Sequence, residues 1–141
     1  ETLLYMAARA QLVKEVIRPS LEKGLIILCD RFLDSTIAYQ GYGNGVDISI
    51  IKEIGDFATR KIKPDLTVLF DIDTKLGLSR TSRHKDRIEL RAIAYHKKVR
   101  AGYLAIARKE PRRMKVIKVN KGVNAVHQEV CGEINRLLGI K

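Results

Sequence analysis

The sequence is poor in cysteine, proline and aromatic residues, and it has no tryptophan. It contains two cysteines, three prolines, three phenylalanines and five tyrosines among 141 residues. Two cysteines are too few for a disulfide framework, so we expect a protein of the reducing cytoplasm. No apolar run approaches the roughly 20 residues of a membrane-spanning helix, and we therefore expect no membrane partner.

Acidic residues are also scarce relative to basic ones. Sixteen Asp and Glu stand against 27 Lys and Arg, which leaves a formal net charge of +11 at pH 7. Such a surplus favours anionic partners, whether nucleic acids, nucleotides or other phosphates, and composition alone does not choose among them. The length and the 45% share of hydrophobic residues fit one domain, which we expect to span residues 1–141.

Apolar spacing predicts an alternation of helices and strands. Steps of three and four predict a first helix from Thr2 to about Ser20, ended by Pro19 and Gly24. Four more helices are predicted: after a cap at Asp47, after a cap at Thr74, over 88–109, and over 124–138 with Gly139 as its stop. Three short apolar runs predict strands at 25–29, 66–70 and 116–119.

This alternation is typical of an α/β fold in which helices flank a parallel sheet on both faces. Sheets of this kind usually have about five strands, whereas three are recognisable here. An absent first βα unit is the simplest explanation. We therefore expect that the sequence is N-terminally incomplete and that the intact protein begins about 50 to 60 residues earlier.

Polar residues follow the first predicted strand, at the edge of a parallel sheet where ligands usually bind. Asp30 can hold a metal ion directly or through water, and the planar guanidinium of Arg31 suits a phosphate. On spacing alone, a surface Asp-Arg pair at a strand end is an equally good interpretation. The hydroxyl, phenol and amide groups that follow, as far as Gly41, favour a binding site.

The stretch from Asp30 to Gly41 reads DRFLDSTIAYQG. It closely resembles the D-R-[YF]-x-x-S-[ST]-x-A-Y-Q-G signature of bacterial thymidylate kinases, enzymes that phosphorylate dTMP to dTDP with ATP. Other segments similar to that family occur in its order: YMAAR at 5–9, VIRP at 16–19, PDLT at 64–67, DID at 71–73, GL at 77–78, DRIE at 86–89 and VRAGY at 99–103. The resemblance covers essentially the whole chain and implies a nucleoside monophosphate kinase of the P-loop NTPase class.

The resemblance implies a site for dTMP. Tyr5 would stack on thymine, and Arg9, one helical turn later, would reach a base carbonyl. Thr36 and Gln40 would hydrogen-bond the base, while Tyr39 would pack beside the deoxyribose and exclude a 2′-hydroxyl. Without the resemblance, an aromatic ring in the apolar stripe of the first helix would be assigned to the core.

The same resemblance implies catalytic roles. Arg31 would bind the dTMP phosphate, and Asp30 would position Mg²⁺ or its waters. The segment 80–87 would be a lid that closes over ATP, and the cations that would bind ATP there are Arg80, Arg83, Lys85 and Arg87. The three arginines are also candidate catalytic residues that stabilise the transferred phosphoryl group. A solvated, charged surface is the alternative interpretation of this segment.

The family's phosphate-binding loop, of the form G-x-x-x-x-G-K-[ST], does not occur in this sequence. Because that loop holds the ATP phosphates, we expect the 141 residues alone to bind ATP poorly. Two alternatives stay open: a related deoxynucleoside or nucleoside monophosphate kinase, and a basic nucleic-acid-binding domain. Scattered cations and few aromatics disfavour the second, so we expect no nucleic-acid partner. The resemblance also implies a homodimer, packed through the helices before Ser20 and after Asp47.

Overall fold

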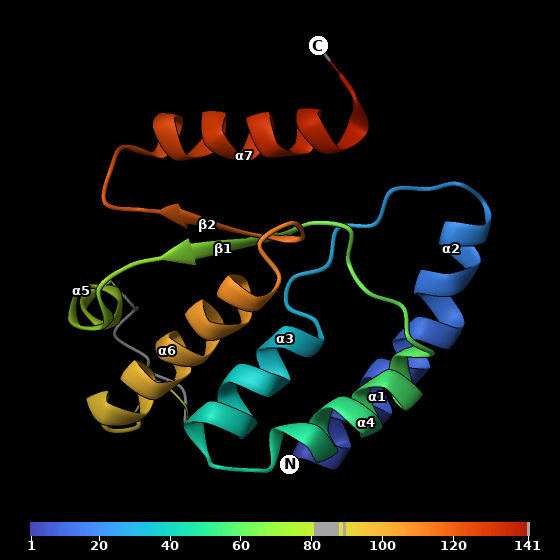
Figure 1. The fold of residues 1–141 in the computed structure, drawn as a ribbon, viewed down its shortest axis with the longest axis horizontal. Coiled ribbons are helices and arrows are strands. Elements are labelled where there is room, and N and C mark those ends of the chain that lie inside the picture. Colours follow the sequence, from blue (N-terminus) through green and yellow to red (C-terminus); the bar gives the residue numbers. More distant parts are fainter. Residues whose placement is uncertain (81–87, 89, 141) are drawn as a thin grey trace. The chain divides into compact units, whose positions relative to one another are not determined.

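The computed structural model describes residues 1–80, 88 and 90–140. The chain divides into two compact units, Glu1–Lys63 and Pro64–Lys141. The first unit is helical, and the second holds the sheet (Figure 1). A single kinase domain over the whole chain stays a prediction. Among the described residues, no helix is both long and apolar enough to cross a membrane.

The first unit opens with a continuous helical rod. It consists of α1 (Thr2–Leu12), the π-helical turn η1 (Val13–Ile17) and α2 (Arg18–Glu22). The prediction that Pro19 ends this helix is wrong, because the rod continues through it. A proline within a helix lacks an N–H and crowds the preceding turn. Here that turn is widened, and the Arg18 N–H bonds back to the Val13 carbonyl, five residues earlier.

The rod ends at Gly24, as the sequence predicts. The Gly24 N–H donates to Leu21 O at 2.9 Å, and the Leu25 N–H donates to Ser20 O at 3.0 Å. Gly24 has a φ of 74°, the left-handed conformation that this pair of bonds requires of the residue just past a helix. A glycine is suited to that position because it has no β-carbon to clash.

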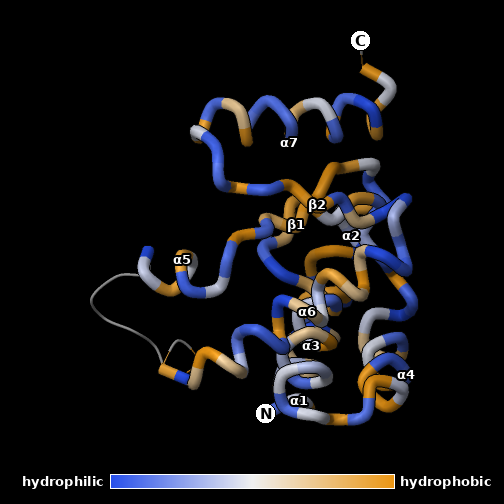
Figure 2. The backbone as a smooth tube through the Cα atoms, turned by 60° about the vertical axis from the view of Figure 1, so that its left-hand side comes forward, coloured by the Kyte–Doolittle hydropathy of each residue, from blue (hydrophilic) through white to orange (hydrophobic). Residues whose placement is uncertain are grey.

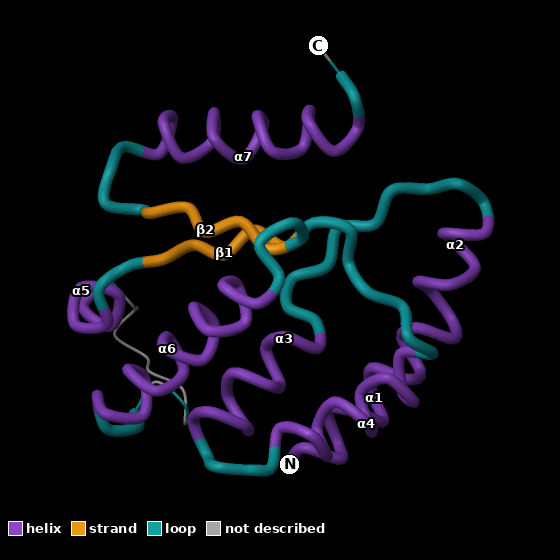
Figure 3. The backbone as a smooth tube through the Cα atoms, in the orientation of Figure 1, coloured by secondary structure: helices purple, strands orange, loops and turns teal. Residues whose placement is uncertain are grey.

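The segment after Gly24 is not the buried strand that its apolar sequence predicts. Residues 25–29 have no regular structure and are drawn as loop in Figure 3, and the Leu28 side chain is 90% exposed. A parallel strand is stabilised by ladder hydrogen bonds to a neighbouring strand. Within the part of the chain that the structure describes, this segment pairs with none.

Three helical segments complete the first unit: α3 (Leu33–Thr36), the π-helical turn η2 (Ile37–Gly43), and α4 (Ile48–Thr59), which packs on α1. Hydrophobic and hydrophilic stretches alternate along α4 (Figure 2). Its predicted cap is confirmed, since an Asp47 carboxylate oxygen accepts the Ser49 N–H at 2.7 Å. That cap's hydrogen bonds, chiefly with the Ser49 side chain, hold the pKa of Asp47 below its usual range.

The core of the first unit joins the rod to the segment that follows residue 30. Val13, Ile17 and Phe32 are buried together, with Ile27 and Leu33 packed against them. The helix after Phe32 lies close to α4 as well. A β-carbon on Gly41 would lie 3.0 Å from Ile48 Cγ1, which is tighter than ordinary van der Waals contact. Close packing against Ile48 therefore favours a glycine at this position of the AYQG motif.

The second unit contains a parallel sheet of two strands, β1 (Thr67–Asp71) and β2 (Met114–Lys118). Thr67 stands opposite Met114, and Asp71 stands opposite Lys118. Helix α6 (Ile93–Lys109) and helix α7 (Val123–Leu138) both pack on β2, and they lie on opposite sides of the sheet (Figure 1). The predicted α/β class with helices on both faces of a parallel sheet is therefore confirmed.

Two helix starts in this unit differ from prediction. The cap of α5 (Thr74–Ser79) is Asp73 and not Thr74, because an Asp73 carboxylate oxygen accepts the Lys75 N–H at 2.9 Å and the Leu76 N–H at 3.2 Å. These bonds hold the pKa of Asp73 below its usual range. Helix α6 begins at Ile93, five residues later than predicted, and no side chain caps it.

Candidate functional site

The turn after residue 29 has an unusual backbone. Arg31 has a φ of 69°, in the left-handed region that side chains other than glycine rarely adopt. Holding an L-residue there costs about 1–2 kcal/mol. Strain of this kind persists where surrounding contacts fix it, and it is common at functional sites. The strained residue is the one that the sequence predicts to bind a phosphate.

The Arg31 side chain is held on two sides. Its Nε donates to Ser35 Oγ at 2.8 Å, and its guanidinium carbon lies 4.4 Å from the centre of the Tyr39 ring. A cation over an aromatic face is attracted to the ring's electrons. The contact brings two predicted site residues, Arg31 and Tyr39, together at the start of the helix formed by α3 and η2. In the described part of the chain, the terminal nitrogens of Arg31 make no hydrogen bond.

Arg9 connects α1 to this turn. Its Nη2 donates to Phe32 O at 3.2 Å, and its guanidinium carbon lies 5.5 Å from the Phe32 ring centre. Burial lowers the pKa of Arg9, and the neighbouring Cys29 and Asp34 oppose that shift. An arginine stays charged even so. Tyr5 is one turn earlier on α1 and is 45% exposed. The structure therefore brings Arg9 to the Asp30–Gly41 motif, while a stacking role for Tyr5 stays a prediction.

Thr36 and Gln40 lie one turn apart on the helix formed by α3 and η2. Each residue is only 3% exposed. Buried amides and hydroxyls normally have hydrogen-bond partners. Both side chains belong to the helix that follows Arg31, and their contacts with a base stay a prediction.

Asp30 is exposed at the start of the turn. The described residues contain no cluster of three potential metal-ligating side chains. Mg²⁺ does not need one, because it is commonly bound by one or two carboxylates together with substrate phosphates and water. Asp30 fits the role of a single carboxylate ligand, direct or through water.

The predicted lid can be placed only at its first residue. Arg80 is exposed at the C-terminal end of α5. Arg83, Lys85 and Arg87 lie outside the described residues. A lid over residues 80–87 that binds ATP therefore stays a prediction.

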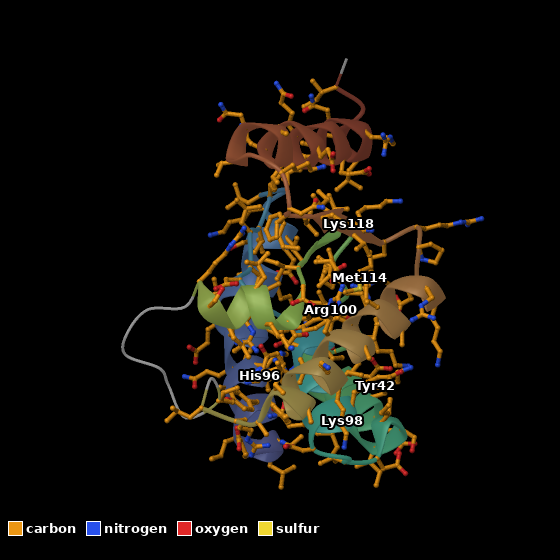
Figure 4. All side chains as sticks on the ribbon, turned by 90° about the vertical axis from the view of Figure 1, so that its left-hand side faces the viewer. Tyr42, His96, Lys98, Arg100, Met114 and Lys118 are labelled. Atoms are coloured by element: carbon orange, nitrogen blue, oxygen red, sulfur yellow. The ribbon has the colours of Figure 1, made fainter. Side chains whose placement is uncertain are left out.

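Two side-chain contacts in the structure are not predicted by the sequence. One is the hydrogen bond from Arg31 to Ser35, a residue of the motif to which no role was assigned. The other is an ion pair in the second unit, where Arg100 contacts Asp71 through two bonds of 2.6 and 3.0 Å. Arg100 projects from the sheet-facing side of α6 and is labelled in Figure 4. These residues are 29 positions apart, so no local pattern could have joined them.

Comparisons with known proteins agree on one family. A sequence model described as Thymidylate kinase matches residues 1–130. The thymidylate kinase of Syntrophus aciditrophicus (strain SB) is 44% identical over 146 residues, which cover 97% of this chain and 67% of that protein. The chain is also 45% identical over 141 residues to the thymidylate kinase of Pelotomaculum thermopropionicum, with 98% of this chain and 65% of that protein covered.

The chain belongs to the thymidylate kinase family. A crystal structure of thymidylate kinase from Ehrlichia chaffeensis supports the fold, with a TM-score of 0.74 and 35% sequence identity over 95% of this chain and 62% of that one. The chain thus spans about two thirds of the length of its thymidylate kinase relatives. The family name itself denotes a phosphotransferase, which confirms the class of protein that the motif predicts.

Proposed function

We propose that this chain forms the acceptor-nucleotide site of an enzyme that transfers a phosphate from ATP to dTMP and yields dTDP. The observation that carries the proposal is the strained Arg31, whose guanidinium is fixed by Ser35 and Tyr39 and keeps its terminal nitrogens unbonded within the described residues. A guanidinium with two free terminal groups matches the geometry of a phosphate.

The neighbouring residues support a pyrimidine deoxynucleotide as the acceptor. Thr36 and Gln40 lie on the helix that follows Arg31 and would hydrogen-bond the base. Arg9 reaches the same turn from α1, and Tyr5, one turn earlier, would stack on the base. Tyr39 already contacts Arg31, so its ring lies next to the predicted phosphate position, as packing against the deoxyribose requires. Phosphoryl transfer depends mainly on alignment and charge neutralisation, and these side chains supply both for the acceptor.

The proposal includes Mg²⁺ and ATP as the family resemblance implies them. Asp30 would hold the metal ion or its waters, and the ion would neutralise phosphate charge when bound. ATP is the phosphate donor in this proposal, with Arg80, Arg83, Lys85 and Arg87 as the predicted donor-site cations. A cytoplasmic location and the absence of a nucleic-acid partner also stay predictions.

A nucleic-acid-binding function has less support. Several cations of the second unit are already engaged, since Arg113 bonds Glu110 and Thr67, and Lys121 pairs with Glu129. Paired cations contribute less to the attraction of a phosphate backbone. A related kinase with another base preference is the closer alternative. Turnover measured with a series of acceptor nucleotides distinguishes it from a thymidylate kinase.

The proposed function is tested with the full-length gene product and a series of acceptors. We expect turnover with ATP and Mg²⁺ to be fastest for dTMP. It should fall about tenfold or more for dUMP, which lacks one methyl group, and further for dCMP and dGMP. Omitting Mg²⁺ is the control and should abolish transfer. Faster turnover with a purine nucleotide would remove the thymidylate assignment.

We also propose that the protein is a homodimer that packs through α1 and α4. These helices contact one another, and together they expose Leu4 and Phe57, the latter 88% exposed. A second copy is the occupant that the family resemblance implies, and a two-fold symmetric interface would bury Leu4 and Phe57 of both copies.

Phe57→Glu should convert the dimer into a monomer in size-exclusion chromatography with light scattering. Burying a phenylalanine stabilises by about 1.5–3 kcal/mol, and a glutamate in its place adds a desolvation cost, so we expect the dimer dissociation constant to rise about 100-fold or more. Lys52→Glu, an exposed polar position on the same helix, is the matched control and should leave the dimer intact. A dimer that survives Phe57→Glu would place the interface elsewhere.

A further inference from the structure

The guanidinium of Arg31 is hydrogen-bonded to Ser35, a residue to which the family resemblance assigns no role. We propose that Ser35 is a positioning residue for phosphate recognition: its hydroxyl holds Arg31 so that the two terminal nitrogens serve the phosphate of the acceptor nucleotide. This inference rests on the proposed function, and it assigns no contact between Ser35 and the nucleotide itself.

Arg31 uses only part of its hydrogen-bonding capacity within the described residues. A guanidinium has five N–H groups in one plane. The Nε–H is taken by Ser35 Oγ at 2.8 Å, and one face of the plane is covered by the Tyr39 ring at 4.4 Å. The four N–H groups on the terminal nitrogens make no hydrogen bond to a described residue. They form the paired edge that binds a phosphate through two parallel bonds.

The Ser35 hydroxyl that accepts this hydrogen bond is held rigidly. Ser35 is 7% exposed, and its own N–H donates to Phe32 O at 3.2 Å in the first turn of α3. A short side chain buried in a helix has little freedom, so its oxygen is a fixed point. The residue that approaches it is exposed and has a long, flexible side chain. The hydrogen bond therefore orders the arginine around the serine.

The backbone at Arg31 also directs its side chain toward Ser35. Arg31 precedes α3 and has a φ of 69°, so its contact with Ser35 does not follow from helical spacing. The left-handed turn and the hydroxyl act together to direct the side chain over the helix. An arginine that is already ordered loses less rotamer entropy when the phosphate binds. The lower entropic cost increases the affinity for the phosphate. The gain applies to the phosphate and not to the base.

The test compares a nucleotide with the corresponding nucleoside. Equilibrium dissociation constants of dTMP and thymidine are measured for the full-length protein and for Ser35→Ala. We expect the constant for dTMP to rise about five- to thirtyfold, because a hydrogen bond to a charged group is lost. The constant for thymidine should stay within about twofold. Ser35→Thr keeps a hydroxyl and should restore most of the dTMP affinity.

Ser20→Ala, in the same unit, is the control and should change neither constant. Equal weakening of dTMP and thymidine would show that Ser35 acts through the fold, and an unchanged dTMP constant would show that its hydroxyl does not position Arg31. Either result overturns the inference while dTMP binding by the unaltered protein still supports the proposed function. If the unaltered protein binds no dTMP, the proposed function fails and the inference fails with it.

Discussion

Replacing Arg31 with alanine should raise the dissociation constant of dTMP about 30- to 1,000-fold, measured by calorimetry on the full-length protein. Hydrogen bonds to charged groups contribute about 1.5–3 kcal/mol each, and a guanidinium can make two with one phosphate, so we expect a loss of about 2–4 kcal/mol. Alanine keeps the β-carbon and therefore the left-handed strain at this position. The change in affinity then reports the guanidinium and not a relaxed backbone.

Two further variants sharpen this prediction. Arg60 is exposed and also has a left-handed backbone, with a φ of 51° at the end of α4, so Arg60→Ala is a matched control and should leave the dTMP constant unchanged. Arg31→Lys keeps the charge but loses both the Nε–H that Ser35 accepts and the paired edge, and it should rescue little. A change of less than about threefold in Arg31→Ala would contradict the role assigned to this side chain.

Helix ends and strands with local signals could be predicted from the sequence. The cap at Asp47 and the stop at Gly139, with its φ of 67°, are confirmed because each depends on a side chain or a backbone conformation within a few residues. The strands at 66–70 and 116–119 are also confirmed, displaced by one or two residues to β1 and β2. The helix signals are reliable because no distant residue decides them, whereas the two strands form because each is the other's parallel partner.

Two predictions fail for reasons that apolar spacing does not show. The run at 25–29 has the composition of a buried strand, but a strand needs a neighbour, and composition does not say which residues supply one. Pro19 ordinarily stops a helix, and here a widened turn before it accommodates the ring. The spacing of apolar residues indicates neither the π-helical turn before Pro19 nor the lack of a paired strand beside residues 25–29.

The sequence predicts which residues belong to the candidate site, but it does not predict how they are arranged. The motif indicated Arg31, Tyr39 and Gln40 through resemblance, since residue types in order carry that information. The positive φ of Arg31 was not predictable, because arginine has no preference for that region and only surrounding contacts enforce it. The role of Ser35 depends on that turn, so it appears only once the turn is known.

The second large effect is expected for stability. In Arg100→Met, the free energy of unfolding should fall by about 2–3 kcal/mol in urea denaturation at pH 7. The Asp71 side chain is 8% exposed, and it loses both bonds of a bidentate pair that also raises the pKa of Arg100. Leaving a buried carboxylate unpaired costs about 3–5 kcal/mol, and the 41% exposure of the arginine reduces that figure because water can reach the site.

A double-mutant cycle separates this cost from the loss of packing. Asp71→Asn in the Arg100→Met background removes the unpaired charge, so the double variant should be about 1–2 kcal/mol more stable than Arg100→Met alone. Arg108→Met makes the same substitution at an exposed position of α6, where the guanidinium donates to the Leu104 carbonyl and to no other described residue, and it should change stability by less than about 0.5 kcal/mol. If the double variant instead had a lower free energy of unfolding than Arg100→Met, the effects of the two substitutions would be independent of each other. The end of β1 would then not depend on the ion pair for its attachment to α6.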